Sequence, residues 1–539
     1  MSSASPHSHR LLLTVAASAA VSLILAGCAP SGGSDTASAG IIIGTTDTVT
    51  SLDPAGSYDN GSFAIMNQVY PFLLNSLPGT SDVEPDIAKS AEFTTETAYT
   101  VTLKPGLTFA NGHELTSSDV KFSFDRQLAI ADENGPSVLL YNLESVETPD
   151  DLTVVFNLKV GNDQVFPQIL SSPAGPIVDE EVFSADAVTA DDDIVAGNAF
   201  AGQYVIDSYS VNDLVTFAPF ADYAGVLGAP ATGDVTLKYF TDQSNLKLSV
   251  QQGDIDVAYR SLSATDIEDL SGDKNVNVVT GPGGEIRYIV FNFDTQPYGA
   301  TTAEADPAKA LAVRQAVADL VDREAIAKQV YKGTYTPLYS YVPDGLTGAT
   351  QVLKDLYGAD GGPDAVAAAA VLSAAGVTTP VTLNLQYNPD HYGTSSGDEY
   401  ALIKSQLEAD GLFTVNLQST EWVQYAKDRT ADLYPAYQLG WFPDYSDADN
   451  YLTPFFLDGG FLANHYNNDE VDKMITAQAT ETDPAARQAL IEDIQAAVAA
   501  DLSTVPLLQG AQIAVAGTDI SGVTLDGSFK FRFGALSKG

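Results

Sequence analysis

Cys28 is the only cysteine in the 539-residue sequence, so the chain cannot form an internal disulfide bond. A fold without such cross-links depends on the burial of apolar side chains. The composition allows this, because 45% of the residues are apolar and only 18% are charged. A chain of this length can form two or three sizeable domains. We therefore expect a globular protein that is stabilised by its hydrophobic cores.

An apolar stretch over residues 11–26 lies between Arg10 and Cys28. It is short for a membrane span, and its basic flank and small residues are typical of a secretory signal. The sequence Leu25-Ala26-Gly27-Cys28 resembles the bacterial lipoprotein box, in which the cysteine is lipidated and becomes the new N-terminus. We therefore predict a signal peptide over 1–27, a lipid anchor on Cys28 that holds the protein at the cell membrane, and a flexible tether over 28–40.

Acidic residues dominate the charge of the chain. Seventy acidic residues against 25 basic ones give a formal net charge of -45, and the acidic residues are dispersed along the sequence. Such a surface repels nucleic acids and anionic lipid headgroups. The charge therefore argues against a nucleic-acid partner, and we expect a soluble extracytoplasmic protein apart from its anchor.

Strand and helix signals alternate along the chain. Runs rich in β-branched and aromatic residues, bounded by Gly, Pro or Asp, predict strands over 41–43, 99–103, 153–158, 235–240, 288–293 and 381–387. Asp306-Pro307 predicts the start of a helix that runs to Lys332, and Asp483-Pro484 predicts another. Thr116 and Asp119 have capping-box spacing before a third helix. Together these signals predict an α/β fold with helices packed on sheets.

Residues 99–123 contain an alternating strand, a Pro-Gly turn, an Asn-Gly turn and a capped helix in close succession. This segment resembles the signature of the family 5 extracellular solute-binding proteins of ABC importers, the family of the oligopeptide-binding and dipeptide-binding proteins. Further segments resemble the family in the expected order, namely 52–54, 253–256, 288–292, 313–326, 440–445, 466–472 and 487–506.

The resemblance implies a bilobal, periplasmic-binding-protein-like clamp of α/β class. Lobe I would comprise residues 41–293 together with 510–539, with an extra subdomain inserted at about 78–198, and lobe II would comprise 294–509. Because the chain leaves lobe I and returns to it, two crossing strands would form the hinge. A ligand would bind in the cleft between the lobes and pass to the permease subunits of the transporter. We expect the protein to act as a monomer.

The resemblance also implies a ligand site at the Gly-Trp-Phe-Pro-Asp segment. In the peptide-binding relatives the Asp, here Asp444, receives the α-ammonium group of the ligand, and the residues before it pair with the ligand backbone. Gly440, Trp441 and Phe442 would supply that backbone edge. A carboxylate in a closed cleft suits this role, because charge-assisted hydrogen bonds are stronger than neutral ones.

The partner of the ligand carboxylate is less defined. Gln438 stands where some oligopeptide-binding relatives have an arginine, and His391 lies near the place where a relative uses a histidine. We therefore predict His391, or another group, as the carboxylate contact. In lobe I, Tyr58, Asn60 and Gly61 are expected to approach the cleft, since an Asn-Gly pair allows close approach of the backbone.

Two other classes of function are compatible with parts of the sequence. A transport protein of the same family could carry a non-peptide ligand, either an oligosaccharide stacked on Trp441 or a metal chelate. Residues 393–397 match a nucleophile-elbow pattern, so a secreted serine hydrolase would use Ser395 with Asp444 and His465. The motif does not follow a strand directly, and Ser396-Gly397-Asp398 is expected to cap a helix over 399–410 instead. We therefore expect no enzyme activity, no cofactor and no protein-ligated metal.

Overall fold

The computed structural model describes residues 40–260, 262–393 and 395–539. Cys28 and the predicted signal peptide lie outside the described residues. No helix within these ranges is both long enough and apolar enough to cross a bilayer.

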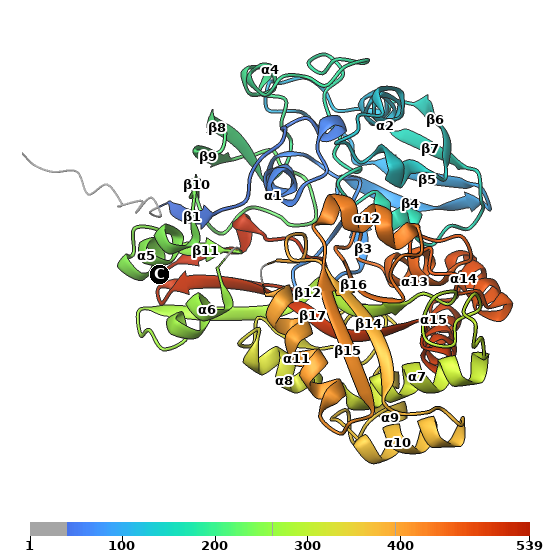
Figure 1. Cartoon of the computed structure of the whole chain (residues 1–539). Helices are drawn as coiled ribbons and strands as arrows, with labels where there is room; N and C mark the ends of the chain where they lie inside the picture. Colours follow the sequence, from blue (N-terminus) through green and yellow to red (C-terminus); the bar gives the residue numbers. More distant parts are fainter. Residues whose placement is uncertain (1–39, 261, 394) are drawn as a thin grey trace, which may run out of the picture. The chain divides into compact units, whose positions relative to one another are not determined.

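An 11-stranded sheet runs through the described part of the chain (Figure 1). Its strands, in spatial order, are β15 (Phe413–Ser419), β14 (Val381–Tyr387), β16 (Ala436–Trp441), β12 (Val276–Phe291), β17 (Thr504–Gly517), β11 (Val257–Tyr259), β1 (Ile41–Thr45), β10 (Val235–Tyr239), β9 (Leu214–Pro219) and β8 (Tyr204–Ser210), with β13 (Tyr335–Pro337) paired to β17. β1 is parallel to both of its neighbours and almost fully buried, as expected for a strand that is covered on both faces.

The long strands β12 and β17 are neighbours in the middle of this sheet, between β16 on one side and β11 on the other. Residues 276–282 of β12 pair with 511–517 of β17, and residues 286–290 pair with 504–509, with a register shift between Pro282 and Ile286. At this irregularity a Cβ on Gly283 would lie 2.2 Å from the carbonyl oxygen of Gly510. A glycine is therefore needed at this point of the strand pair.

A separate four-stranded antiparallel sheet consists of β4 (Ala88–Thr95), β5 (Ala98–Leu103), β7 (Thr153–Leu158) and β6 (Leu143–Asp150). In β5 and β7 buried and partly exposed residues alternate, because one face of the sheet packs on α2 and the other faces solvent. Two short pairs complete the strands, β2 (Leu74–Ser76) with β3 (Val83–Pro85) and β18 (Ile520–Ser521) with β19 (Ser537–Lys538).

The helices follow the strands in irregular alternation. The described α-helices are α1 (Asn60–Val69), α2 (Ser117–Ile130), α3 (Phe166–Ile169), α4 (Asp191–Gly197), α5 (Gln243–Gln252), α6 (Ala264–Leu270), α7 (Pro307–Leu320), α8 (Arg323–Gln329), α9 (Val352–Leu356), α10 (Ala365–Ala374), α11 (Ser396–Glu408), α12 (Trp422–Thr430), α13 (Asp449–Phe456), α14 (Asp469–Thr480) and α15 (Pro484–Asp501). Three short 3-10 helices are η1 (Pro54–Gly56), η2 (Ser137–Leu140) and η3 (Phe533–Ala535).

Most of the predicted elements are confirmed, and two helices differ from prediction. The predicted helix from Pro307 to Lys332 is two helices, α7 and α8. The chain becomes extended at Val321, and the Asp322 side chain then accepts a hydrogen bond from the Ala325 amide and starts α8. The helix predicted over 399–410 begins three residues earlier, at Ser396, whose buried hydroxyl accepts a hydrogen bond from Gln438 instead of capping the helix.

Three large hydrophobic cores hold these elements together. One core draws its buried residues from 286–508 and packs α7, α10, α11 and α15 with β12, β14 and β16. A second is formed by α1, β1, β8, β9 and β10 with segments near the C-terminus. A third lies under the four-stranded sheet, over residues 73–201. As predicted for a chain without a disulfide, burial of apolar side chains holds the described residues together.

Candidate functional site

Two adjoining cavities lie beside the segment 440–446. Their volumes are about 310 Å³ and 190 Å³, and we call them the larger and the smaller cavity. Both are lined by Asn60, Phe442, Pro443 and Phe529. They therefore meet at residues from the start of α1, the end of β16 and the C-terminal segment, which are far apart in the sequence.

Asp444 and Tyr58 lie together in the lining of the smaller cavity. The Tyr58 hydroxyl donates a short hydrogen bond to one carboxylate oxygen of Asp444, and Asn450 Nδ2 donates to the other at 3.0 Å. Burial, with the nearby charge of Asp444 as the next contribution, raises the pKa of Tyr58 far above its usual value. Tyr58 therefore stays protonated and donates. Because a carboxylate can accept about four hydrogen bonds, Asp444 can still accept from a ligand.

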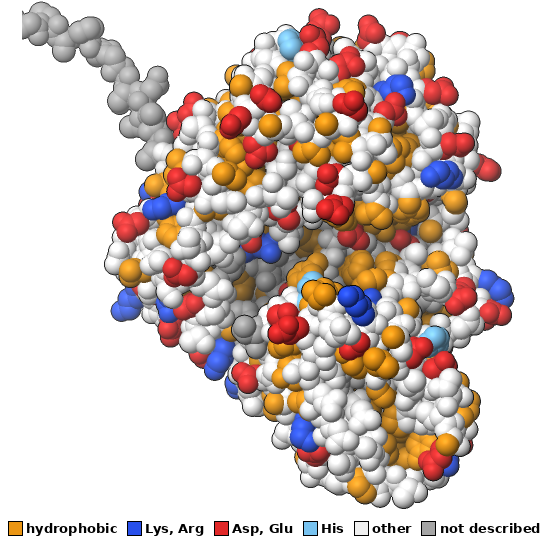
Figure 2. All heavy atoms as spheres, turned by 45° about the horizontal axis from the view of Figure 1, so that its top comes forward, with side chains coloured by type: hydrophobic (Ala, Val, Ile, Leu, Met, Phe, Trp, Pro, Cys, Tyr) orange, Lys and Arg blue, Asp and Glu red, His pale blue; other side chains and the backbone are white. Residues whose placement is uncertain are grey.

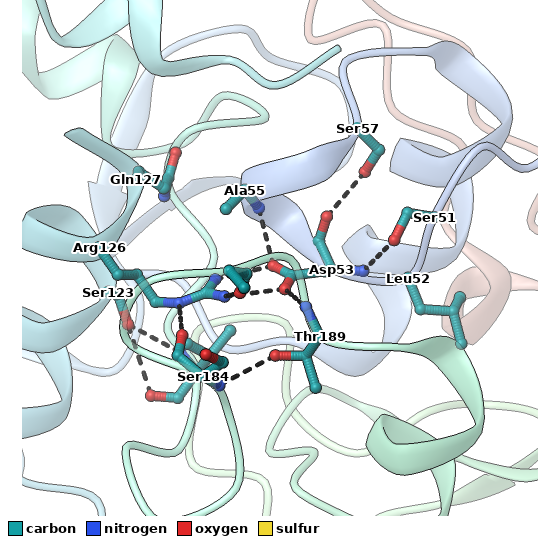
Figure 3. A network of polar contacts seen from close by, with 12 residues as sticks. Ser51, Leu52, Asp53, Ala55, Ser57, Ser123, Arg126, Gln127, Ser184 and Thr189 are labelled. Atoms are coloured by element: carbon teal, nitrogen blue, oxygen red, sulfur yellow. Dashed lines mark hydrogen bonds and ion pairs between the residues drawn. The ribbon is translucent and has the colours of Figure 1, made fainter. Parts of the chain in front are cut away.

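A buried ion pair fixes the loop that leads to Tyr58 (Figure 3). Asp53 and Arg126 of α2 form a bidentate pair, with N–O distances of 2.7 and 2.8 Å. The same carboxylate accepts from the backbone amides of Ala55 and Thr189. The carbonyl oxygen of Asp53 accepts from the Ser57 hydroxyl at 3.1 Å. Asp53, in the segment 52–54 that resembles the family, thus anchors the backbone immediately before Tyr58.

Asn60 and Gly61 have different roles at the start of α1. Asn60 is exposed and lines both cavities. Gly61 is buried and lines neither, and a Cβ at this position would lie 2.0 Å from the carbonyl oxygen of Thr48. The close backbone approach that requires this glycine is therefore made by Thr48 of the same chain.

The three residues at the end of β16 also differ in their environments. The Gly440 carbonyl oxygen accepts hydrogen bonds from the hydroxyls of Tyr288 and Tyr392. Trp441 packs edge-on against Phe455 and donates from its indole to Asn450 at 2.8 Å. Only Phe442, which is 44% exposed, lines the two cavities. β16 pairs with β12 along its length, whereas its pairing with β14 ends at Tyr437.

His391 belongs to an aromatic cluster next to the cavities. Its ring stacks on Trp422 with a centroid distance of 3.8 Å and lies edge-on to Phe442 at 6.2 Å. Desolvation in this cluster lowers the pKa of His391, although part of the residue is exposed. The imidazole is therefore mainly neutral at neutral pH. His391 does not line either cavity.

The residues of the alternative hydrolase site have other partners. His465 Nε2 lies 2.7 Å from Asp432, whereas Asp444 is bonded to Tyr58 and Asn450. The side-chain amide of Gln438 accepts a hydrogen bond from the Asn388 backbone amide and donates one to the Ser396 hydroxyl. Within the described ranges no group of three His, Cys, Asp or Glu side chains is placed to hold a metal ion.

The larger cavity contains charged residues that no sequence motif identifies. Glu285 lines it and accepts a hydrogen bond from Tyr335 at 2.5 Å. Arg260 also lines it, has a positive φ of 62°, and lies 3.5 Å from Asp47. These positions follow from the crossing of β12 and β17 and from the loop after β11, which a local motif does not reveal.

Lys530 is a charged lining residue of the smaller cavity that was likewise not predicted from the sequence. It is only 6% exposed and donates to the Ser171 hydroxyl at 2.5 Å. Burial lowers the pKa of Lys530 well below its usual value, and neighbouring Arg532 lowers it further. A possible sequence signal was the alternation of Phe529, Phe531 and Phe533 with these two cations, because basic side chains inside an aromatic run are unusual on a solvated surface.

Known proteins resemble this chain over most of its length. The family described as bacterial extracellular solute-binding proteins, family 5 Middle, matches residues 82–462. The probable D,D-dipeptide-binding periplasmic protein of Escherichia coli strain K12 is 25% identical over 485 residues, which cover 87% of this chain and 88% of that protein.

Two solved structures share the fold. HbpA2 from Haemophilus parasuis has a TM-score of 0.79 at 21% identity and covers 93% of this chain and 100% of its own. The dipeptide-binding protein from Pseudoalteromonas sp. SM9913, in complex with Met-Leu, has a TM-score of 0.68 at 20% identity, with coverage of 93% and 100%. The predicted α/β class and bilobal binding-protein fold are thereby confirmed. Since the family match spans more than half of the sequence, the chain belongs to family 5 of the bacterial extracellular solute-binding proteins.

Proposed function

We propose that the protein captures short peptides outside the cytoplasm and delivers them to the membrane permease of an ABC importer. The observation that carries the proposal is the carboxylate of Asp444 in the lining of the smaller cavity, oriented by Tyr58 and Asn450. The names of the relatives agree with this ligand class, since one is a D,D-dipeptide-binding protein and another was solved with Met-Leu.

Asp444 would bind the α-ammonium group of the peptide. An ammonium group has three donors, and a carboxylate shielded from water gives it a hydrogen bond about twice as strong as a neutral one. The end of β16, from Gly440 to Phe442, would pair with the peptide backbone, which permits many side-chain sequences. The pairing of β16 with β14 ends before this segment and supports such an edge.

Replacement of Asp444 by Asn tests this contact because it removes the charge and nearly preserves the shape. Loss of the charged hydrogen bond should weaken peptide binding by about 2 to 5 kcal/mol, mostly through faster dissociation. N-acetylation of the peptide removes the same charge from the ligand. The two changes should be non-additive, since they delete one shared interaction.

Calorimetric titration of wild type and Asp444→Asn with free and acetylated peptide gives the four affinities required. Equal affinities in all four titrations would exclude the ammonium contact and favour an uncharged ligand. Two independent, additive losses would mean that Asp444 stabilises the cleft without touching the amine.

The two alternative functions receive less support. The oligosaccharide alternative relies on stacking against Trp441, but Trp441 packs on Phe455 and Phe461 and does not line either cavity. A hydrolase would need His465 near Asp444, whereas His465 pairs with Asp432. His391 remains a predicted contact for the ligand carboxylate, beside the cavities rather than in their lining.

The lobes that enclose the ligand would be 41–293 with 510–539, and 294–509, with an inserted subdomain at about 78–198. The separate hydrophobic cores support this division, because one draws on residues 286–508 and another on 73–201. β12 and β17 would be the two hinge crossings, since β12 also pairs with β16 on one side of the large sheet and β17 also pairs with β11 on the other.

A lipid on Cys28 would keep the protein at the cell membrane beside its permease. The support is the Leu-Ala-Gly-Cys sequence after an apolar stretch. Replacement of Cys28 by Ala should move the protein from the membrane fraction to the soluble fraction. Two acyl chains on one cysteine anchor a protein stably, and alanine cannot carry them. Cell fractionation followed by immunoblotting measures this. A variant that remains with the membrane as fully as the parent rules the lipid anchor out.

A further inference from the structure

Two basic residues, Lys530 and Arg532, lie buried side by side, and Lys530 lines the smaller cavity. Lys530 is 6% exposed and Arg532 is 4% exposed. Both donate to the same acceptor, since Asn75 Oδ1 lies 3.2 Å from Lys530 Nζ and 3.0 Å from Arg532 Nη2. Within the described residues neither cation is part of an ion pair within 4.0 Å, although both are enclosed by the protein.

The other partners of these cations are uncharged. Lys530 Nζ donates to the Ser171 hydroxyl, and Arg532 Nη2 donates to the carbonyl and hydroxyl oxygens of Ser76. The Nε and Nη1 atoms of Arg532 are buried without a hydrogen-bond partner. The donor capacity of the pair therefore exceeds what the surrounding protein accepts.

The nearest carboxylates are held by other donors. Asp86 accepts from Asn75, from the Tyr223 hydroxyl and from the Val226 amide. Asp526 accepts from the amides of Gly79 and Ser528. Burying a charge without a close opposite charge is costly, and a shift of the pKa toward the neutral form is the usual response. The lowered pKa of Lys530 is such a response.

We propose that Lys530 binds the C-terminal carboxylate of the ligand, in the same cavity in which Asp444 binds the ammonium group. This rests on the proposed function and narrows it to a small zwitterion of dipeptide length. Both groups belong to the lining of a single cavity of about 190 Å³, which is small for a ligand site. Ser446 Oγ, which donates to the Ser528 carbonyl at 3.2 Å, links the two segments that carry Asp444 and Lys530.

The wall around Lys530 supports a carboxylate as the bound group. Ser171, which contacts Lys530, and Ser172, Ser81 and Gln168 are uncharged lining residues, and the acidic residues of the lining are Asp59 and Asp444. A bound carboxylate restores the charged form of Lys530, because an opposite charge at short range favours protonation of the amine. A side-chain carboxylate offers the same chemistry, so the experiment must separate it from the C-terminus.

Native mass spectrometry can measure this with an equimolar mixture of Ala-X dipeptides and their C-terminal amides, offered to the intact protein. Wild type should retain each free acid about tenfold or more over its amide, the loss expected for one charged hydrogen bond. Lys530→Met should bring this ratio below about threefold, since the cation is gone. Lys530→Gln, which keeps a donor for Ser171, should lose the preference similarly. Lys89→Met, an exposed site on β4, should keep it.

The outcomes separate this inference from the proposed function. Retention of no Ala-X peptide in either form overturns both. Equal retention of acids and amides by wild type overturns the Lys530 contact and leaves peptide binding intact, and it needs no variant. A preference that persists in Lys530→Met but disappears in His391→Gln assigns the carboxylate to His391. If Ala-Asp amide binds wild type as well as the free acids do, while Ala-Asn amide does not, the anion is a side chain and the C-terminal assignment is wrong.

Discussion

At the scale of single residues, the ion pair of Asp53 and Arg126 anchors the backbone just before Tyr58, a residue proposed to lie at the ligand site. The two side chains are 0% and 1% exposed, and every oxygen of the Asp53 carboxylate accepts hydrogen bonds from the guanidinium and from backbone amides. Arg126 also donates to the carbonyl oxygens of Ser184 and Ala187. The pair therefore joins three segments of the chain at one point.

Removal of one charge from this pair should be strongly destabilising. Asp53→Asn leaves the Arg126 guanidinium buried without a counter-charge, and such changes cost about 3 to 5 kcal/mol of unfolding free energy. The same helix offers a control in Lys121 and Asp125, whose side chains are 42% and 46% exposed. Asp125→Asn should cost no more than about 0.5 kcal/mol, because exposed pairs contribute little.

Denaturant unfolding of the two variants and wild type, followed by circular dichroism, compares the two costs. Similar small losses in both variants would show that the buried pair does not stabilise this region. Calorimetry with a bound peptide can then show whether the displaced Tyr58 also weakens binding.

At the scale of secondary structure elements, unambiguous local sequence signals were sufficient to predict where a strand or a helix lies. The strand at 153–158 alternates partly exposed and buried residues, and Asp483-Pro484 starts α15 as predicted. The break between α7 and α8 could not be predicted with the same ease, since the apolar pattern continues across it. Asp322 caps the start of α8, but in a sequence a capping Asp cannot be told from an Asp on the surface of one continuous helix.

The candidate site depends on contacts between elements that are distant in the sequence. Asp444 was predicted from its motif, and its partner Tyr58 lies 386 residues away. Lys530 and Glu285 were not predicted, because their significance comes from burial beside a cavity. A motif identifies residues that act together locally. It does not identify a charged residue that the fold brings to the site from another segment.

At the scale of the whole molecule, the charge restricts which ligands can approach. Acidic side chains are spread over the face shown in Figure 2, basic ones are fewer, and the formal net charge is -45. Strongly anionic ligands are repelled at long range. A short zwitterionic peptide has no net charge and avoids this repulsion, while its two termini still make strong contacts once inside. The overall charge and the contacts proposed for Asp444 and Lys530 are thus compatible with the same ligand class.

The most direct test of this account is native mass spectrometry of the protein purified from its own cells without unfolding and refolding. Binding clefts that enclose their ligands often keep them through purification, since most differences in affinity appear in the dissociation rate. We predict bound species whose masses and fragments match short unmodified peptides, mainly dipeptides, and which disappear in Asp444→Asn. Bound oligosaccharides or metal chelates, retained equally by wild type and Asp444→Asn, would contradict the account.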